Sequence, residues 1–128
     1  MASRFATVIN CMDGRVQHPV NEWMKIKTGA EYIDVITEAG PDKIMASTAT
    51  ASRLILQRIL VSRDKHKSTK LALVAHHDCA GNPVAKEEHI RQLSQAAKIM
   101  ATWNLGMKIL LLWVDENWEV ELISELDD

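Results

Sequence analysis

Short apolar runs that alternate with longer amphipathic stretches are the feature that most constrains this chain. Four such runs predict buried strands, at residues 5–10, 32–37, 71–75 and 108–114. The stretches between them carry apolar residues at helical spacing and predict helices over residues 19–29, 43–62 and 84–103. Strands that alternate with helices favour a mainly parallel sheet with helices on both faces. We therefore expect an α/β fold around a central, mainly parallel four-stranded β-sheet.

The C-terminal segment carries weaker signals than the rest of the chain. Residues 119–123 predict a short edge strand, and the acidic tail at residues 125–128 is expected to fray. No linker, repeat or low-complexity segment interrupts the pattern, and a chain of 128 residues is the size of one domain. We therefore expect a single domain over residues 1–128.

Charge and hydropathy exclude several classes of partner. The formal net charge is −2, without the clustered basic face that nucleic-acid binding requires, so we expect no nucleic-acid partner. The longest apolar run, residues 109–114, is far shorter than the roughly 20 residues of a membrane span. The N-terminus has no apolar signal region before a cleavage site, and we expect a cytoplasmic protein with no membrane partner.

The two cysteines lie directly after predicted strands. Cys11 follows the strand at residues 5–10, whereas His76 and Cys79 follow the strand at residues 71–75. Ligand sites in such folds lie at the carboxyl ends of parallel strands, so these side chains are expected at one edge of the sheet. Two thiolates and one imidazole form a three-ligand zinc set with one open position, which is the arrangement of a catalytic zinc. The sequence thus predicts one Zn²⁺ per chain.

Asp13 and Arg15 follow Cys11 closely enough to lie beside such a metal. The carboxylate of Asp13 could accept a proton from metal-activated water, or it could occupy the open position itself. Arg15 could hold that carboxylate through a two-pronged hydrogen bond and lower its pKa. The alternative is a simple salt bridge within the loop.

Other interpretations of these residues remain open. The two cysteines could be ordinary buried thiols or a disulfide, although a reducing cytosol disfavours the latter. His77 competes with His76 as a ligand, but strand alternation points it away from the face that His76 uses. The tryptophans near the fourth strand are expected in the core or in a subunit contact: Trp103, Trp113 and Trp118.

Both metal-site segments resemble the signatures of one known family, the β-class carbonic anhydrases. The signatures are Cys-x-Asp-x-Arg after the first strand and His-x-x-Cys after the third. They stand here as Cys11-Met12-Asp13-Gly14-Arg15 and His76-His77-Asp78-Cys79. The resemblance extends over residues 5–114 in the order of elements as well as in the motifs.

The resemblance implies a zinc lyase. Cys11, His76 and Cys79 would be the zinc ligands, and Asp13 and Arg15 would be the catalytic dyad. The reaction would be reversible hydration of carbon dioxide to bicarbonate by zinc-bound hydroxide. The resemblance also implies a homodimer or a higher homo-oligomer, in agreement with a predicted helix at residues 43–62 that is apolar on more than one face.

The chain departs from the family pattern where substrate would bind. It is short for the family and is expected to lack the N-terminal helical arm that wraps a partner subunit. The family's Arg-Asn-Ala-Gly-Asn segment is here residues 37–41, of which only Ala39 and Gly40 agree, and Ala80 separates Cys79 from Gly81. Gln17 is only a loose candidate for the substrate-contacting glutamine. The alternatives are therefore a non-catalytic zinc-binding relative and a hydrolase of carbon disulfide or carbonyl sulfide.

Overall fold

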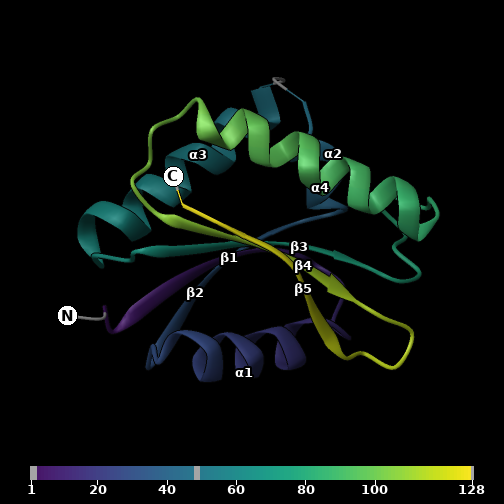
Figure 1. The fold of residues 1–128 in the computed structure, drawn as a ribbon, viewed down its shortest axis with the longest axis horizontal. Coiled ribbons are helices and arrows are strands. Elements are labelled where there is room, and N and C mark those ends of the chain that lie inside the picture. Colours follow the sequence, from purple (N-terminus) through teal and green to yellow (C-terminus); the bar gives the residue numbers. More distant parts are fainter. Residues whose placement is uncertain (1–2, 48–49, 128) are drawn as a thin grey trace.

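A five-stranded sheet forms the centre of the computed structural model, which describes residues 3–47 and 50–127. The strands are β1 (Phe5–Cys11), β2 (Tyr32–Glu38), β3 (Lys70–His76), β4 (Lys108–Val114) and β5 (Val120–Leu126). Their order across the sheet is β2-β1-β3-β4-β5 (Figure 1). The pairs β1–β2, β1–β3 and β3–β4 are parallel, whereas β5 pairs antiparallel with β4. The predicted α/β fold with a mainly parallel sheet is confirmed.

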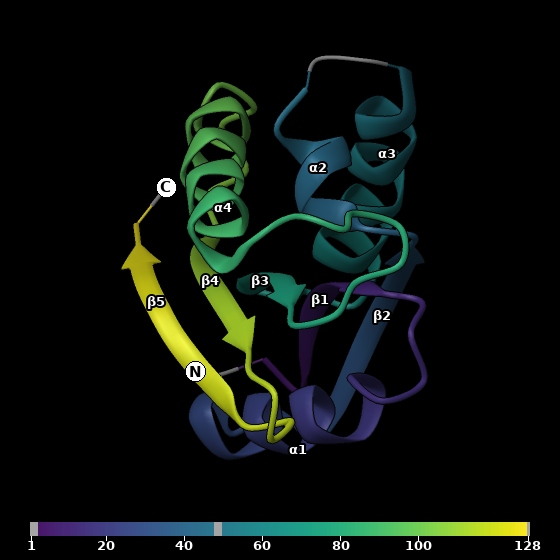
Figure 2. The ribbon, with the colours of Figure 1, turned by 90° about the vertical axis from the view of Figure 1, so that its right-hand side faces the viewer.

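Helices cover both faces of the sheet, as the alternation of elements predicts. One face is covered by α1 (Gln17–Thr28), and the other by α2 (Pro41–Met45), α3 (Thr50–Lys65) and α4 (Lys86–Ala101) (Figures 1 and 2). None of the helices in residues 3–47 and 50–127 combines the length and apolar character that a membrane crossing requires.

Strand alternation divides the core between the two faces. Val8 and Val74 pack in a cluster with residues of α1, whereas Ile9 and Leu73 pack in a cluster with residues of α3 and α4. In β3 and β4, every residue after the first is buried. Burial on both faces explains why these strands are continuous apolar runs rather than alternating ones.

The single helix predicted at residues 43–62 is wrong, because the segment forms two helices. Gly40, at a left-handed φ of 64°, leads into Pro41 at the start of α2, which ends at Met45. The next helix begins only at Thr50, and residues 48–49 lie outside the described part of the chain. The intervening segment is rich in Ser and Thr, whose hydroxyl groups compete for backbone hydrogen bonds and favour caps and turns over helix interiors.

The C-terminal segment is more ordered than the sequence predicts. The edge strand expected at residues 119–123 is present, but β5 continues to Leu126 and includes part of the tail that was expected to fray. Glu125 lies within ion-pair distance of Lys27 at 3.5 Å and Lys108 at 3.4 Å. These lysines and the backbone of β4 provide non-local partners for the acidic segment.

Candidate metal centre

The carboxyl ends of β1 and β3 bring the three predicted ligand residues together. Cys11 ends β1, His76 ends the neighbouring β3, and Cys79 lies three residues farther along the following loop. All three side chains are buried, and one sulfur or nitrogen atom from each lies within 4.8 Å of the others. A buried set of two thiols and one imidazole is a donor set that zinc prefers.

The imidazole of His76 is oriented for metal binding. Its Nδ1 lies 2.7 Å from the carbonyl oxygen of His77. Because a carbonyl only accepts hydrogen bonds, Nδ1 carries a proton, and in the neutral imidazole Nε2 then keeps its lone pair. Nε2 is buried and has no hydrogen-bond partner among the described residues. An orphaned nitrogen of this kind, held by a backbone carbonyl at the other ring nitrogen, is typical of a metal-ligating histidine.

The separation of the two sulfur atoms also fits a shared zinc ion. The Sγ atoms of Cys11 and Cys79 are 3.9 Å apart, and both cysteines are free. Two thiolates at about 2.3 Å from one tetrahedral zinc would lie about 3.8 Å apart. The disulfide considered from the sequence is therefore absent between these two residues.

The two thiols differ in their readiness to ionise. Burial by itself raises the pKa of Cys11. His76 and the backbone amides of Gly40 and Asp13 lower this pKa by more than burial raises it, so the net shift is downward. Burial and the adjacent Cys11 raise the pKa of Cys79. A divalent cation between the two sulfur atoms would favour ionisation of both.

Two glycine-containing loops cross closely behind the sulfur atoms. A Cβ atom on Gly40 would lie 2.7 Å from Asn82 Cβ, and one on Gly81 would lie 2.6 Å from the carbonyl carbon of Ala39. The amides of Gly40 and Gly81 hydrogen-bond the sulfur atoms of Cys11 and Cys79, respectively. Glycine therefore allows the approach that brings backbone donors to both thiols.

Asp13 and Arg15 form the ion pair that the sequence predicts. Arg15 Nη2 donates to Asp13 Oδ2 at 2.7 Å, and Arg15 Nε donates to Asp13 Oδ1 at 3.0 Å. The backbone amide of Arg15 donates to Oδ1 as well, at 2.9 Å. These hydrogen bonds, the guanidinium contact foremost, lower the pKa of Asp13 to about 2. The carboxylate is thus engaged with Arg15 and is charged at neutral pH.

Three residues near the cluster make contacts outside it. His77 is exposed and lies outside the cluster, and its amide donates to the Val114 carbonyl at 2.9 Å. Gln17 does not face the site as a free amide, because its Nε2 donates to the Cys11 carbonyl. Glu38, in the segment that departs from the family pattern, pairs with Arg58 at 3.3 Å.

Two contacts of Arg15 were not foreseen from the sequence. Its Nη1 lies 3.3 Å from Asp78 Oδ2, and its Nη2 donates to the Asp78 carbonyl at 3.2 Å. Its guanidinium carbon lies 4.4 Å from the ring centroid of Trp118, in the β4–β5 connection. The loop that holds Cys79 and the distant hairpin therefore both reach Arg15. No sequence pattern links Trp118 to this site, because their proximity depends on the topology of the sheet.

Hollows flank the cluster on two sides. One, of about 330 Å³, opens beside Cys11 and Asp13. Its lining is completed by Met12 and by four small residues, Gly14, Ala39, Ala80 and Gly81. The other, of about 370 Å³, lies beyond Cys79 and is lined in part by His77, Lys86 and Trp113. Asp13 is the one acidic residue in the lining of the first hollow.

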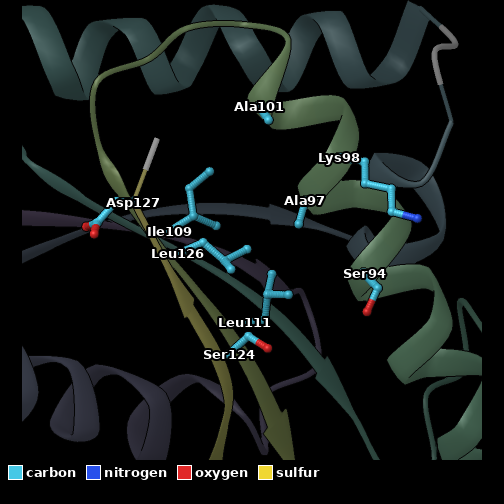
Figure 3. Close-up of a pocket in the computed structure, with 9 residues that line it drawn as sticks. All are labelled: Ser94, Ala97, Lys98, Ala101, Ile109, Leu111, Ser124, Leu126 and Asp127. Atoms are coloured by element: carbon cyan, nitrogen blue, oxygen red, sulfur yellow. The ribbon is translucent and has the colours of Figure 1, made fainter.

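A larger hollow of about 410 Å³ lies away from this chemistry, between α4 and the strands β4 and β5 (Figure 3). Its lining is Ser94, Ala97, Lys98, Ala101, Ile109, Leu111, Ser124, Leu126 and Asp127. The group of metal-ligating side chains found among the described residues, Cys11, His76 and Cys79, lies outside this hollow, so the cysteine cluster is the better candidate site.

Comparisons with known proteins identify the family and the fold. The family described as "Putative carbonic anhydrase" matches residues 1–124, whereas no curated protein matches the sequence. The fold is similar to that of a carbonic anhydrase from Streptococcus mutans, with a TM-score of 0.66 at 13% identity over 96% of this chain and 82% of that one. It is also similar to the β-carbonic anhydrase isoform I of Trichomonas vaginalis, with a TM-score of 0.62 at 15% identity over 95% of this chain and 82% of that one.

A further solved relative has the same fold. The fold is similar to that of a β-carbonic anhydrase from Sordaria macrospora, with a TM-score of 0.55 at 10% identity over 98% of this chain and 83% of that one. At these identities the structural matches establish the fold alone, and the evidence for the family is the match over residues 1–124. Because that match extends over nearly the whole chain, this protein belongs to the carbonic anhydrase family and has the β-class fold.

Proposed function

We propose that this protein binds one zinc ion through Cys11, His76 and Cys79 and catalyses the reversible hydration of carbon dioxide to bicarbonate. The observation that carries the proposal is the buried cluster of two thiols and an imidazole whose Nε2 has no partner among the described residues. When bound, zinc would supply a Lewis acid that makes water nucleophilic at neutral pH. The family match supports this assignment.

Asp13 would orient the reacting water or accept a proton from it. Its carboxylate remains charged because Arg15 lowers its pKa to about 2, so it presents an acceptor at any physiological pH. Both of its oxygen atoms bond Arg15, which turns the carboxylate away from ligation and favours an open fourth metal position. This geometry supports a catalytic role over the non-catalytic alternative.

The hollow beside Cys11 and Asp13 would receive the substrate. Its lining of small, mostly apolar groups suits a small linear molecule without charge, and Asp13 supplies the only carboxylate among the residues that line it. Carbon disulfide and carbonyl sulfide have similar shapes, so the hollow does not select among these gases by size.

Metal analysis combined with stopped-flow assays tests the proposal. We expect one zinc per chain in the wild type and a loss of zinc and activity in Cys11→Ser and His76→Ala. His77→Ala is the matched control, because its exposed side chain lies outside the cluster, and it should retain zinc. Asp13→Asn should retain zinc and hydrate carbon dioxide roughly 10²-fold more slowly, in the range of general acid–base contributions.

Each alternative function has its own outcome in these assays. Zinc-replete protein that hydrates carbon dioxide no faster than Cys11→Ser would indicate the non-catalytic relative. Faster turnover of carbon disulfide or carbonyl sulfide than of carbon dioxide would indicate the hydrolase. Both measurements use the same purified protein, so they can be compared directly.

We also propose that the protein is a homodimer or a higher homo-oligomer. Apolar side chains are exposed on the edge strand β2, at Tyr32 and Val35, and on the neighbouring α3, at Leu54 and Val61. Exposed apolar groups that gather on adjacent elements mark interaction surfaces. Two β-carbonic anhydrases of Sordaria macrospora are tetrameric. Light scattering that shows a monomer at micromolar concentration would contradict this proposal.

A further inference from the structure

The side chain of Arg15 is anchored on three sides. It bonds the carboxylate of Asp13 through Nε and Nη2, and it reaches the side chain and the carbonyl of Asp78. The central carbon of its guanidinium lies over the ring of Trp118, at 4.4 Å from the ring centroid. An arginine that is 46% exposed would otherwise hold its partner weakly, because surface ion pairs are loosely ordered and screened.

The hairpin between β4 and β5 holds Trp118 in place. Trp118 donates its amide to the Asp115 carbonyl at 3.0 Å, while Asp115 Oδ1 accepts the amides of Asn117 at 2.9 Å and Glu119 at 3.0 Å. The indole is half-buried and packs against the α1-side core cluster. Its ring is therefore a supported surface and not a freely moving side chain.

The backbone of Trp118 is unusual for a bulky residue. Its φ is 60°, in the left-handed region that Gly and Asn adopt far more readily. Asn117, one position earlier, is a residue type that adopts this conformation readily, yet it is Trp118 that has the positive φ. Strained positions of this kind persist where surrounding contacts enforce them, and they often occur at functional sites.

We propose that Trp118 is a positioning residue, whose indole ring fixes the plane of the Arg15 guanidinium and through it the carboxylate of Asp13. This inference rests on the proposed function of the Asp13–Arg15 pair. A guanidinium stacked on an aromatic ring retains its edges for hydrogen bonding, so the ring limits rotation without competing for donors. The site would then depend on a hairpin that supplies neither a metal ligand nor a proton acceptor.

Side-chain NMR tests the contact independently of activity. In ¹⁵N-labelled protein, the Arg15 Nε–Hε resonance, assigned by its loss in Arg15→Lys, should be shifted upfield by the indole ring. Trp118→Leu should remove this shift, and Trp118→Phe should retain part of it at the same backbone position. An Arg15 resonance without an upfield shift in the wild type would overturn the proposal, even if no Trp118 variant folded.

Kinetics test whether the contact acts through Arg15. We expect Trp118→Leu to lower kcat roughly two- to fivefold, which corresponds to a cation–π contact at an exposed site, while zinc content is unchanged. In an Arg15→Gln background, the same substitution should change kcat by less than about 1.5-fold, because coupled residues are not additive. Trp103→Leu, which removes a tryptophan packed against the other core cluster, serves as the control and should leave kcat near the wild-type value.

The possible outcomes separate the two proposals. An equal loss of kcat in the wild-type and Arg15→Gln backgrounds would show a general structural effect and overturn the positioning role. A wild-type protein without hydration activity would refute the proposed function, and the NMR experiment would still decide whether Trp118 orders Arg15.

Discussion

Replacing Gly81 by Ala would force a methyl group into the crossing of two loops. The new Cβ would lie 2.6 Å from the Ala39 carbonyl carbon, 2.8 Å from Ala39 Cβ and 2.9 Å from Ala39 O. Ordinary contacts begin at 3.4 Å, so the loops must separate by about 0.8 Å (3.4 − 2.6) along the shortest contact. Two of the three atoms belong to the backbone and cannot rotate away, and overpacking of this kind costs about 1–3 kcal/mol.

The effect should be steric and should extend to the metal site. Gly81 is not among the glycines at positive φ, so alanine adds no backbone strain there. Its amide hydrogen-bonds the sulfur of Cys79, and displacement of that donor should weaken zinc binding. Loss of partners that support metal ligands typically lowers affinity about 10–100-fold, which is the range expected for Gly81→Ala.

Urea unfolding of the metal-free protein measures the change in the free energy of unfolding, and competition with a chromophoric chelator measures zinc affinity. Gly14→Ala is the matched control for stability, because its added Cβ would meet no atom within 4 Å and its φ is not positive. We expect Gly14→Ala to change the free energy of unfolding by no more than about 0.5 kcal/mol. Equal stability of Gly81→Ala and Gly14→Ala would refute the predicted overpacking, because the two loops would then separate with no loss in the free energy of unfolding.

Three further predictions concern metal, pH and a buried network. Removing zinc with a chelator should lower Tm by about 10 °C relative to protein with free zinc 100-fold above Kd, and an unchanged Tm in calorimetry would argue against a folded-state zinc site. The folded-state pKa of Asp13, about 2, lies below its ordinary value of 3.8, so its stabilisation is present above about pH 4 and is lost as pH falls toward 2. The stability difference between wild type and Asp13→Asn in urea unfolding should therefore narrow over that range, and a constant difference would contradict the assignment. His89→Leu should destabilise the protein by about 2 kcal/mol in the same assay. The reason is that His89 Nδ1 and Asp42 Oδ2 form a hydrogen bond of 2.5 Å between two side chains that are each 1% exposed. A destabilisation below about 0.5 kcal/mol would contradict this prediction.

Elements whose signals are local were predicted well from the sequence. Runs of buried strand residues such as those of β3 and β4 are recognisable because burial on both faces requires continuous apolar character. The break between α2 and α3 was missed because apolar residues occur at helical spacing on both sides of it. The full length of β5 was missed because its partners, the edge of β4 and the lysines that face Glu125, are distant in sequence.

The sequence by itself was enough to predict the cluster of Cys11, His76 and Cys79 and its place at the carboxyl ends of strands, because residue types and strand ends are both encoded in short segments. Only the tertiary structure decided how that set is surrounded. It placed Nε2 of His76 without a partner among the described residues, brought Gly81 against Ala39, and laid Arg15 over Trp118. The physical reason is that such contacts depend on sheet order and loop crossing, which join residues that no local pattern relates.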